Sequence, residues 1–331
     1  MGPIGARWVE IAAQAMFHTL VASLFVEALV RSWRVHEPRQ RMALRVVALA
    51  YPLVLFPAIL AAFPFRTGEE FGESWALFAG RRWEDLGFLG VGLLHWWVAA
   101  FAAAGAALFL LDLVPLVRAR RRPRPVPAAP DPQSAAILRE ELPGLAEAFR
   151  LPPPPVVFLD RDAPVLFCTG VRRHAIVISR GAVRLLDRQE LRAALAHELA
   201  HLARHDPAAS WVVMVARGLL FFNPAFQVLS RAIAKDAEWL ADEEAARVCG
   251  DRLCLASGLI KLHRATAGPP PVRRTLPLAA ALVEPLDRAR SLDVEVRCRR
   301  LLDDAQAPLP FAPARVALAA SALLALLFFV I

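Results

Sequence analysis

The chain has 331 residues, 57% of them hydrophobic, and a formal net charge of +8 at pH 7. This apolar content is high for a soluble globular protein, so membrane-spanning segments are expected. Nearly all of the positive charge is arginine, because lysine occurs only at Lys235 and Lys261, and together with abundant alanine and proline this is typical of a compositionally biased genome. The charge therefore does not indicate a nucleic-acid partner, and we expect none.

Residues 1–116 contain three stretches apolar enough to span a membrane, which takes about 20 apolar residues. These stretches cover residues 8–30, 46–65 and 87–111. A shorter apolar stretch ends the chain and is predicted to form a further span within residues 311–331. The sequence therefore predicts an α-helical membrane protein with about four transmembrane helices.

The arginines in the loops predict how these helices are oriented. Five arginines lie between residues 31 and 45, and five more lie between residues 118 and 124. The intervening loop, 66–86, has three arginines against five acidic residues. Arginine-rich loops remain in the cytoplasm. We therefore expect a multi-pass protein of a bacterial-type inner membrane, with its N-terminus outside and residues 135–310 in the cytoplasm.

The region between the third and fourth spans is predicted to be a linker followed by an α+β domain. Residues 117–134 are rich in arginine and proline and lack apolar periodicity, as expected for a semi-rigid linker. In the domain, 135–310, an amphipathic helix over 135–149 precedes short runs with strand character. These runs are VVFL (156–159), VLFC (165–168) and HAIVIS (174–179). Together they predict a small sheet.

Three helical segments are predicted after the sheet. Asp187 and Glu190 form a D-x-x-E capping box, which predicts the start of a helix that runs to about Arg204. The apolar run WVVMVARGLLFF, residues 211–222, predicts either a buried core helix or a helix that lies against the membrane. At 12 residues it is too short to span a bilayer, so we favour the core helix. A long helix is predicted to follow over residues 225–248.

The first of these helices carries an H-E-x-x-H motif in the stretch LAHELAHLARHD. Residues four apart lie on one face of a helix, so His197 and His201 can both direct their imidazoles at one metal ion. Glu198 is next to that face, where it can reach a water at the metal and act as general base. Catalytic zinc takes three protein ligands and keeps one position open, so a third ligand must come from elsewhere.

The candidate for the third ligand lies in KDAEWLADEEAARV, on the long helix. Glu238 and Asp242 are again four apart and share a face. Glu238 would complete a His-His-Glu zinc site, and Asp242 would accept a hydrogen bond from a ligand histidine and fix its tautomer. His205 lies eight residues after His197, about 12 Å along the helix, which is too far to share the ion. We expect His205 at the surface or in the wall of the site.

The order of several segments resembles membrane metallopeptidases typified by the β-lactam sensor-transducers of the BlaR/MecR type. These segments are GVRRHAIVISRGAV, LRAALAHELAHLARHD, FFNP and EWLAD. The HtpX and CAAX-prenyl protease group shares the H-E-x-x-H and E-x-x-A-D pairing but arranges its spans differently. The resemblance implies a gluzincin-type zinc metallopeptidase domain, with His197, His201 and Glu238 as ligands and Glu198 as the base.

Two further points follow from this resemblance. The segment VRCRRLL, residues 296–302, is similar to a family segment R-I-x-x-L-L, which makes Arg297 a candidate for lining the site. Sensor-transducers carry a penicillin-binding domain after the last span, whereas this sequence stops at Ile331. The resemblance therefore implies the protease and its zinc, and it does not imply antibiotic sensing.

The expected function is zinc-dependent cleavage of a protein or peptide substrate at or near the cytoplasmic face of the membrane. Regulatory signalling with a separate sensor or regulator protein is one setting for this activity. We expect the substrate to add as a strand to an exposed sheet edge, with HAIVIS as the predicted edge. Two alternatives remain open: a quality-control or CAAX-type processing protease, and a non-catalytic membrane scaffold or sensor subunit.

Overall fold

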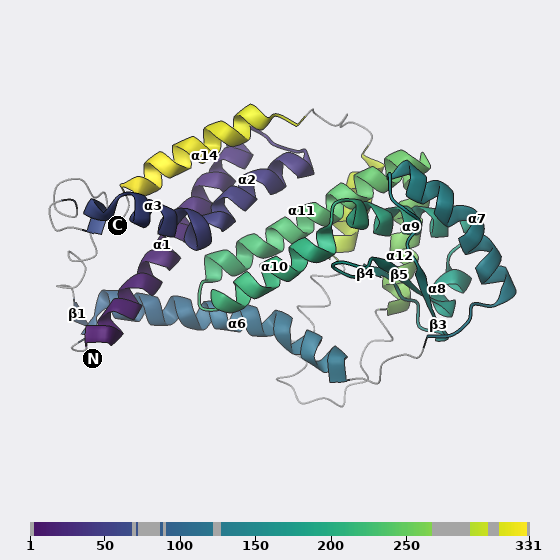
Figure 1. Cartoon of the computed structure of the whole chain (residues 1–331), viewed down its shortest axis with the longest axis horizontal. Helices are drawn as coiled ribbons and strands as arrows, with labels where there is room; N and C mark the ends of the chain where they lie inside the picture. Colours follow the sequence, from purple (N-terminus) through teal and green to yellow (C-terminus); the bar gives the residue numbers. More distant parts are fainter. Residues whose placement is uncertain are drawn as a thin grey trace. The chain divides into compact units, whose positions relative to one another are not determined.

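The chain folds into two compact units (Figure 1). The computed structural model describes residues 3–67, 71, 87–88, 91–121, 127–266, 292–303 and 311–329. The first unit, here called the helical unit, combines Met1–Arg122, Val212–Asp236 and Pro308–Ile331. The second, here called the α+β unit, combines Pro123–Trp211 and Ala237–Ala307. Residues 212–236 thus cluster with the N-terminal helices, although the sequence places them within the α+β domain.

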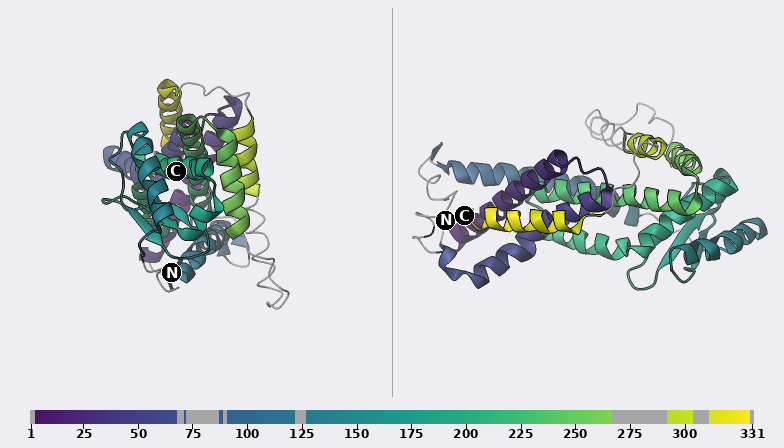
Figure 2. Two further views of the ribbon diagram at one scale, coloured as in Figure 1. Left: turned by 90° about the vertical axis from the view of Figure 1, so that its right-hand side faces the viewer. Right: turned by 90° about the horizontal axis from the view of Figure 1, so that it is seen from above.

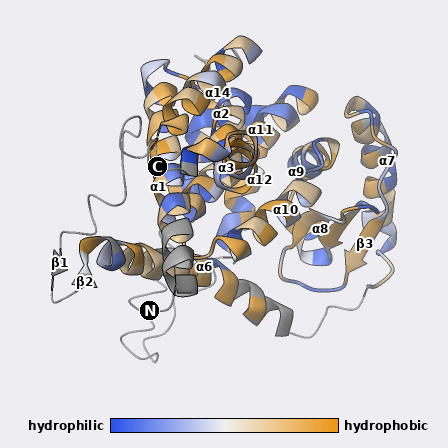
Figure 3. Ribbon diagram, turned by 60° about the vertical axis from the view of Figure 1, so that its left-hand side comes forward, coloured by the Kyte–Doolittle hydropathy of each residue, from blue (hydrophilic) through white to orange (hydrophobic). Residues whose placement is uncertain are grey.

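The helical unit contains the longest apolar helices of the chain, and hydrophobic residues follow one another along them (Figure 3). Its helices are α1 (Pro3–Ser32), α2 (Pro38–Ala50), α3 (Phe56–Ala62), α6 (Leu93–Arg121) and α14 (Pro313–Phe328). A π-helical turn, η1 (Tyr51–Leu55), joins α2 to α3, and a 3-10 turn, η2 (Pro64–Thr67), follows α3. Two short antiparallel strands, β1 (Gly87–Phe88) and β2 (Val91–Gly92), precede α6.

Three segments of these helices are long and apolar enough to cross a membrane: Ala12–Ser32, Pro38–Ala62 and His95–Val114. They overlap the three N-terminal spans expected from the sequence. The second begins earlier than expected because the Glu37 side chain caps α2 by accepting hydrogen bonds from backbone N–H groups of its first turn. Helix α14, where a fourth span is expected, has 16 residues and is shorter than the length usually needed to span.

Charged side chains inside the helical unit pair with one another. Arg45 Nε donates to Glu27 Oε1 at 2.7 Å, and Arg45 also pairs with Asp236, which is completely buried. Arg41 Nε lies 3.3 Å from Asp236 Oδ1. Removing one partner of such a buried pair would leave the other charge uncompensated, which is strongly destabilising. This cluster joins α1 and α2 to the middle of a third helix, α11 (Pro224–Cys249).

The α+β unit is built on a three-stranded sheet. Its strands are β3 (Val156–Leu159), β4 (Leu166–Thr169) and β5 (Ala175–Ser179), in the order β3-β5-β4. Strand β5 runs parallel to β3 and antiparallel to β4. The expectation that HAIVIS forms a sheet edge is therefore wrong, because this run is the central strand. Its side chains are buried from Ile176 to Ser179, as suits a strand covered by neighbours on both sides.

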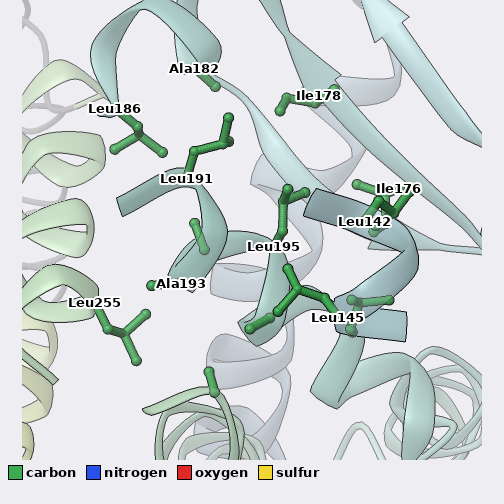
Figure 4. Packing of buried hydrophobic residues seen from close by; sticks show 14 of the residues in the cluster. Leu142, Leu145, Ile176, Ile178, Ala182, Leu186, Leu191, Ala193, Leu195 and Leu255 are labelled. Carbon is green, nitrogen blue, oxygen red and sulfur yellow. The ribbon is translucent and has the colours of Figure 1, made fainter. Parts of the chain in front are cut away.

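Helices cover this sheet and form the core of the unit with it. They are α7 (Pro132–Ala148), α8 (Arg180–Leu185), α9 (Arg188–Ala203), α12 (Arg252–Thr266) and a further helix over residues 292–302. Leu191 and Leu195 of α9 pack among Ile176 and Ile178 of β5 and Leu145 of α7, and all five side chains are at most 1% exposed (Figure 4). Helix α9 is therefore held firmly by the core of its unit.

A complete capping box begins α9, as the sequence predicts. Asp187 Oδ1 accepts from Glu190 N at 2.9 Å, and Glu190 Oε2 accepts from Asp187 N at 3.0 Å. Glu190 is also held by Lys261 Nζ and Ser257 Oγ of α12, each at 2.6 Å. The capping box therefore fixes both the start of α9 and its contact with α12.

Replacing Asp187 by alanine is expected to destabilise the protein by about 1 kcal/mol, because it removes the side-chain acceptor at the start of α9. Thermal unfolding of the purified full chain would show a lowered midpoint. Asp162→Ala is the matched control, since the Asp162 side chain is 82% exposed. Equal midpoints for the two variants would mean that the cap contributes nothing to stability.

Two helices connect the units. Helix α10 (Asp206–Leu219) follows α9, and α11 follows α10 after a short turn (Figure 2). The expectation that residues 211–222 form a buried core helix is wrong. On α10, Val212, Val215 and Leu219 are 70%, 57% and 66% exposed, and only Ala216 is buried. The apolar pattern predicted a helix correctly. The same pattern arises whether an apolar face packs against protein or against lipid, so the pattern alone could not show that this face is buried in a core.

Candidate metal centre

The three side chains expected to hold a metal lie together. Helix α9 positions His197 and His201 on one face, and α11 brings Glu238 opposite them. His197 Nε2 and His201 Nε2 are 3.2 Å apart. Glu238 Oε2 lies 3.5 Å from His197 Nε2, and Glu238 Oε1 lies 3.5 Å from His201 Nε2. Among the described residues these three side chains form the group that could hold a metal ion.

These separations fit a tetrahedral ion. Zinc lies about 2.0–2.2 Å from nitrogen and oxygen ligands, so ligand atoms at the corners of such a tetrahedron are roughly 3.3–3.6 Å apart. The separations of 3.2 and 3.5 Å agree with that geometry. Two neutral imidazoles and one carboxylate also match the ligand set of a catalytic zinc, with a corner left for water or substrate.

Each histidine has a carboxylate at its other ring nitrogen. Asp242 Oδ1 lies 3.0 Å from His197 Nδ1, as expected from the sequence. Asp206 Oδ2 lies 2.7 Å from His201 Nδ1, a contact that the sequence analysis missed. Such a carboxylate keeps the proton on Nδ1, which leaves the lone pair of Nε2 free for a metal. The only indication of this contact in the sequence was the position of Asp206, just after the end of the helix that carries the motif.

We predict that Asp206→Asn and Asp242→Asn each lower zinc affinity or activity roughly 10–100-fold, the usual effect of removing such a partner. Competition of the purified protein against a zinc-binding dye would measure the affinity. The exposed Asp162→Asn, on the same unit, is the control and should bind zinc as the native chain does. Unchanged affinity in either variant would return that aspartate to a purely structural role.

Arg297, from the helix over residues 292–302, pairs with both acidic groups of α11. Its Nε and Nη2 donate to the two oxygens of Asp242, each at 2.7 Å, and its Nη1 lies 3.0 Å from Glu238 Oε2. A bidentate arginine of this kind fixes the orientation of a carboxylate as well as its charge. The structure therefore places Arg297 beside the candidate ligands, in contact with the carboxylates of both Glu238 and Asp242.

The charges shift the pKa values of these groups. Burial by itself would raise the pKa of Glu238, but His197 and Arg297 hold it well below its usual range. Burial likewise opposes ionisation of Asp242, whose pKa is lowered by its hydrogen bonds to Arg297 and His197. Burial would lower the pKa of His197, yet the two carboxylates raise it to about 10. Both acids are therefore ionised, and a metal ion has to displace a proton from His197.

Arg204 supports the second histidine in a similar way. It pairs with Asp206, donates from Nη1 to Glu244 Oε2 at 2.6 Å, and donates from Nη2 to the backbone oxygen of Ala237 at 3.1 Å. Ala237 directly precedes Glu238, so Arg204 ties the end of the motif helix to the part of α11 that carries the third candidate ligand.

The carboxylate of Glu198 contacts the edge strand. Glu198 Oε2 accepts a hydrogen bond from the backbone N–H of Cys168 on β4 at 2.7 Å. In the three-stranded sheet β4 is an outer strand, so this contact places the carboxylate at a free strand edge. The proximity of Glu198 to β4 could not be read from the sequence, because it depends on the strand order.

A cavity of about 190 Å³ adjoins the proposed ligands. It is lined by His197, Glu198, Glu238 and Arg297, together with Ala194 and four leucines: Leu166, Leu255, Leu259 and Leu262. His205 is not among its lining residues. Its backbone has a φ of +58°, and its exposed ring lies 5.8 Å from that of His174. Of the two residues suggested to line the site, Arg297 lines this cavity and His205 is exposed at the surface.

Comparison with known proteins connects this geometry to peptidases. Residues 156–274 match the family model described as BlaR1 peptidase M56. The matched region includes the sheet and all three candidate ligands. It also includes the whole turn between α10 and α11.

Curated relatives are also similar to part of the chain. A protease HtpX homolog of Methylibium petroleiphilum is 32% identical over 177 residues, which cover 44% of this chain and 61% of that protein. A protease HtpX homolog of Burkholderia multivorans is 32% identical over 171 residues, covering 42% and 59%. The chain thus spans about three fifths of the length of these relatives.

The apolar helices and these matches make the chain similar to one class of protein, the membrane metalloproteases. Within that class, the family that the chain resembles is the M56/HtpX type of membrane zinc metallopeptidases.

Proposed function

We propose that this protein is a membrane-bound zinc metalloendopeptidase. The observation that carries the proposal is the convergence of His197, His201 and Glu238 at separations of 3.2–3.5 Å, with an aspartate behind each histidine. Zinc held by these three side chains would polarise the scissile carbonyl and lower the pKa of a water towards about 7.

The chain's own residues supply the proton transfers. Glu198 is the proposed general base: it would take the proton of the attacking water and later deliver it to the leaving amine. The Cys168 N–H at 2.7 Å holds one carboxylate oxygen of Glu198, which leaves the other oxygen to accept that proton. Asp206 and Asp242 keep both histidines in the tautomer that exposes Nε2.

We propose β4, in place of β5, as the strand to which the substrate adds. The backbone N–H of Ser179 donates to Val165 O at 2.9 Å, so Val165 faces β5. Backbone groups alternate in direction along a strand, so Leu166 presents its N–H and carbonyl oxygen to the outer edge. Cys168 presents its carbonyl oxygen there, since its N–H is bound to Glu198. A peptide paired there would lie next to Glu198, and the leucines of the cavity would receive one of its aliphatic side chains.

The arginine-rich loops support cleavage at the cytoplasmic face of an inner membrane. Regulatory cleavage is the proposed setting, because the family model that matches is that of the BlaR1 peptidase. Quality control is the alternative, favoured by the similarity to protease HtpX homologs.

Metal removal tests the proposal. The purified full chain is expected to contain one zinc and to cleave an unfolded protein substrate. Dialysis against a chelator should remove the zinc and the cleavage together, and zinc added back should restore both. A chain that binds zinc yet cleaves no peptide, with or without membranes, would favour the scaffold alternative. Cleavage that survives complete zinc removal would exclude a metallopeptidase.

A further inference from the structure

The turn between α1 and α2 and the start of α14 enclose a small cavity in the helical unit. Its volume is about 30 Å³, and Arg34, Glu37, Gln40, Ala312 and Arg315 are among its lining residues. Gln40, which is 4% exposed, joins the two walls of the cavity. Its Nε2 donates to Ala312 O at 3.2 Å, and its Oε1 accepts from Ala312 N at 2.9 Å. A buried side chain thus holds together two segments that lie far apart in the sequence (Figure 1).

Two arginines of this cavity present their charges to the outside. Arg41 and Arg45, further along the same segment, both pair with the buried Asp236. Arg34 and Arg315 are exposed, and in the part of the chain that the structure describes no carboxylate pairs with either of them. The first two arginines are therefore used inside the protein, whereas the guanidinium groups of Arg34 and Arg315 are available to a ligand.

The carboxylate of Glu37 also lines the cavity, but the backbone of α2 engages it. Its Oε1 accepts from Arg39 N at 2.9 Å, and its Oε2 accepts from Gln40 N, which caps the helix. The helix dipole stabilises a negative charge at this position. Arg39 adds a further positive charge, with its guanidinium 5.2 Å from the centre of the Phe311 ring. The surroundings of the cavity therefore attract an anion.

The backbone of Arg34 has a conformation that usually belongs to glycine. Its φ is +49°, and Val35 N donates to Val30 O at 2.9 Å, the hydrogen bond that ends a helix through a left-handed residue. Glycine adopts this conformation without the steric cost that a Cβ brings. The turn therefore does not need the side chain of Arg34, and glycine can replace this arginine with the backbone preserved.

The cavity lies where the candidate membrane spans end. The span Ala12–Ser32 stops just before Arg34, and the span Pro38–Ala62 begins just after it. Arg315 is in the first turn of α14, and Leu318, three residues further on the same face, is 62% exposed. Positive charge at the end of two spans, with exposed apolar surface next to it, matches the phosphate and the acyl chains of a phospholipid.

We propose that this cavity binds the phosphate group of an anionic phospholipid, with Arg34 and Arg315 as the residues that contact it. Basic pockets between membrane helices bind lipid headgroups of this kind. The planar fork of donors of an arginine also matches the oxygens of a phosphate. A cavity of about 30 Å³ admits a phosphate oxygen and leaves the rest of the headgroup outside, as suits a lipid that remains in its leaflet. The bound lipid would connect α14 to the turn between α1 and α2.

Native mass spectrometry of the purified full chain, released from detergent, tests this site. The chain is titrated with phosphatidylglycerol or with phosphatidylcholine of the same acyl chains, and the fraction that carries one lipid is measured. The cavity variants are Arg34→Gly and Arg315→Gln. Arg150→Gly is the matched control, because Arg150 is exposed and its φ of +56° at the end of α7 likewise suits glycine.

We expect phosphatidylglycerol to bind more tightly than phosphatidylcholine. Each cavity variant should weaken the binding of phosphatidylglycerol about fivefold, the contribution of one arginine near an anionic membrane surface. Arg150→Gly should bind this lipid as the native chain does. Neither glycine variant should lower the midpoint of thermal unfolding, so weaker binding by Arg34→Gly would not reflect misfolding.

Equal affinity for the two lipids would overturn the proposal, as would native binding of phosphatidylglycerol by both cavity variants. An equal loss in Arg150→Gly and Arg34→Gly would show a general effect of charge, which also overturns it. A further titration uses inorganic phosphate alone. Phosphate that binds through Arg34 and Arg315 and is not displaced by phosphatidylglycerol would make this a site for a free anion instead of a lipid. No step uses zinc or cleavage, so these outcomes are independent of the proposed function.

Discussion

Glu198→Gln is expected to abolish peptide cleavage while zinc remains bound. The amide is nearly isosteric with the carboxylate and can still accept a hydrogen bond from Cys168 N–H, but it cannot take a proton from water. General-base catalysis contributes roughly 10²–10⁴-fold, so the rate should fall by at least about 10². The side chain is not one of the three candidate ligands, and zinc content should therefore equal that of the native chain.

The measurement is a comparison of protein N-termini, by mass spectrometry, in host cells that carry the native chain or Glu198→Gln. Termini that require Glu198 would identify both the activity and its substrates. Zinc analysis of the two purified proteins is the control for folding of the site. Undiminished cleavage by the variant would remove Glu198 from the role of base, and loss of zinc would show that it serves the metal instead.

Glu238→Ala is expected to lose zinc. Removing one of three protein ligands should weaken binding by more than the roughly 10–100-fold found for residues behind the ligands. The substitution also removes the contact between Arg297 and Glu238, whereas the contact between Arg297 and Asp242 remains. Zinc content after dialysis, and affinity in competition with a zinc-binding dye, would measure the effect.

Glu243→Ala is the matched control for this prediction. Glu243 lies on the same helix, five residues further on, and pairs with Arg300 at 2.6 Å, away from the two histidines. It should bind zinc as tightly as the native chain. If Glu238→Ala kept its zinc while Glu243→Ala lost it, the third ligand would have been assigned to the wrong residue of α11.

Local features of this protein could be predicted from its sequence. The capping box at Asp187 begins α9, the motif histidines share one face, and Glu238 and Asp242 share another. Each of these relations spans at most four residues, a distance over which helix geometry alone fixes the neighbours. The strand segments could be located for the same reason, because the alternation of apolar and polar residues and the enrichment in β-branched residues are features of a few consecutive positions.

Contacts between distant segments could not be predicted. Asp206 reaches His201 because the chain turns at His205, whose φ is +58°, and nothing in the composition of the stretch required that turn. Strand order decided that β4, and not β5, lies at the edge beside Glu198. The three strands have similar apolar character, so sequence pattern gave no way to rank them.

The sequence by itself predicted the class of chemistry, since the candidate ligand types and their four-residue spacings follow from helix geometry and from what zinc binds. Tertiary structure decided which groups lie beside the candidate ligands, which strand lies at the edge of the sheet, and that residues 212–236 cluster with the N-terminal apolar helices. The physical reason is that apolar periodicity records only that a face avoids water. Whether protein or lipid covers that face is decided by contacts between segments far apart in the chain.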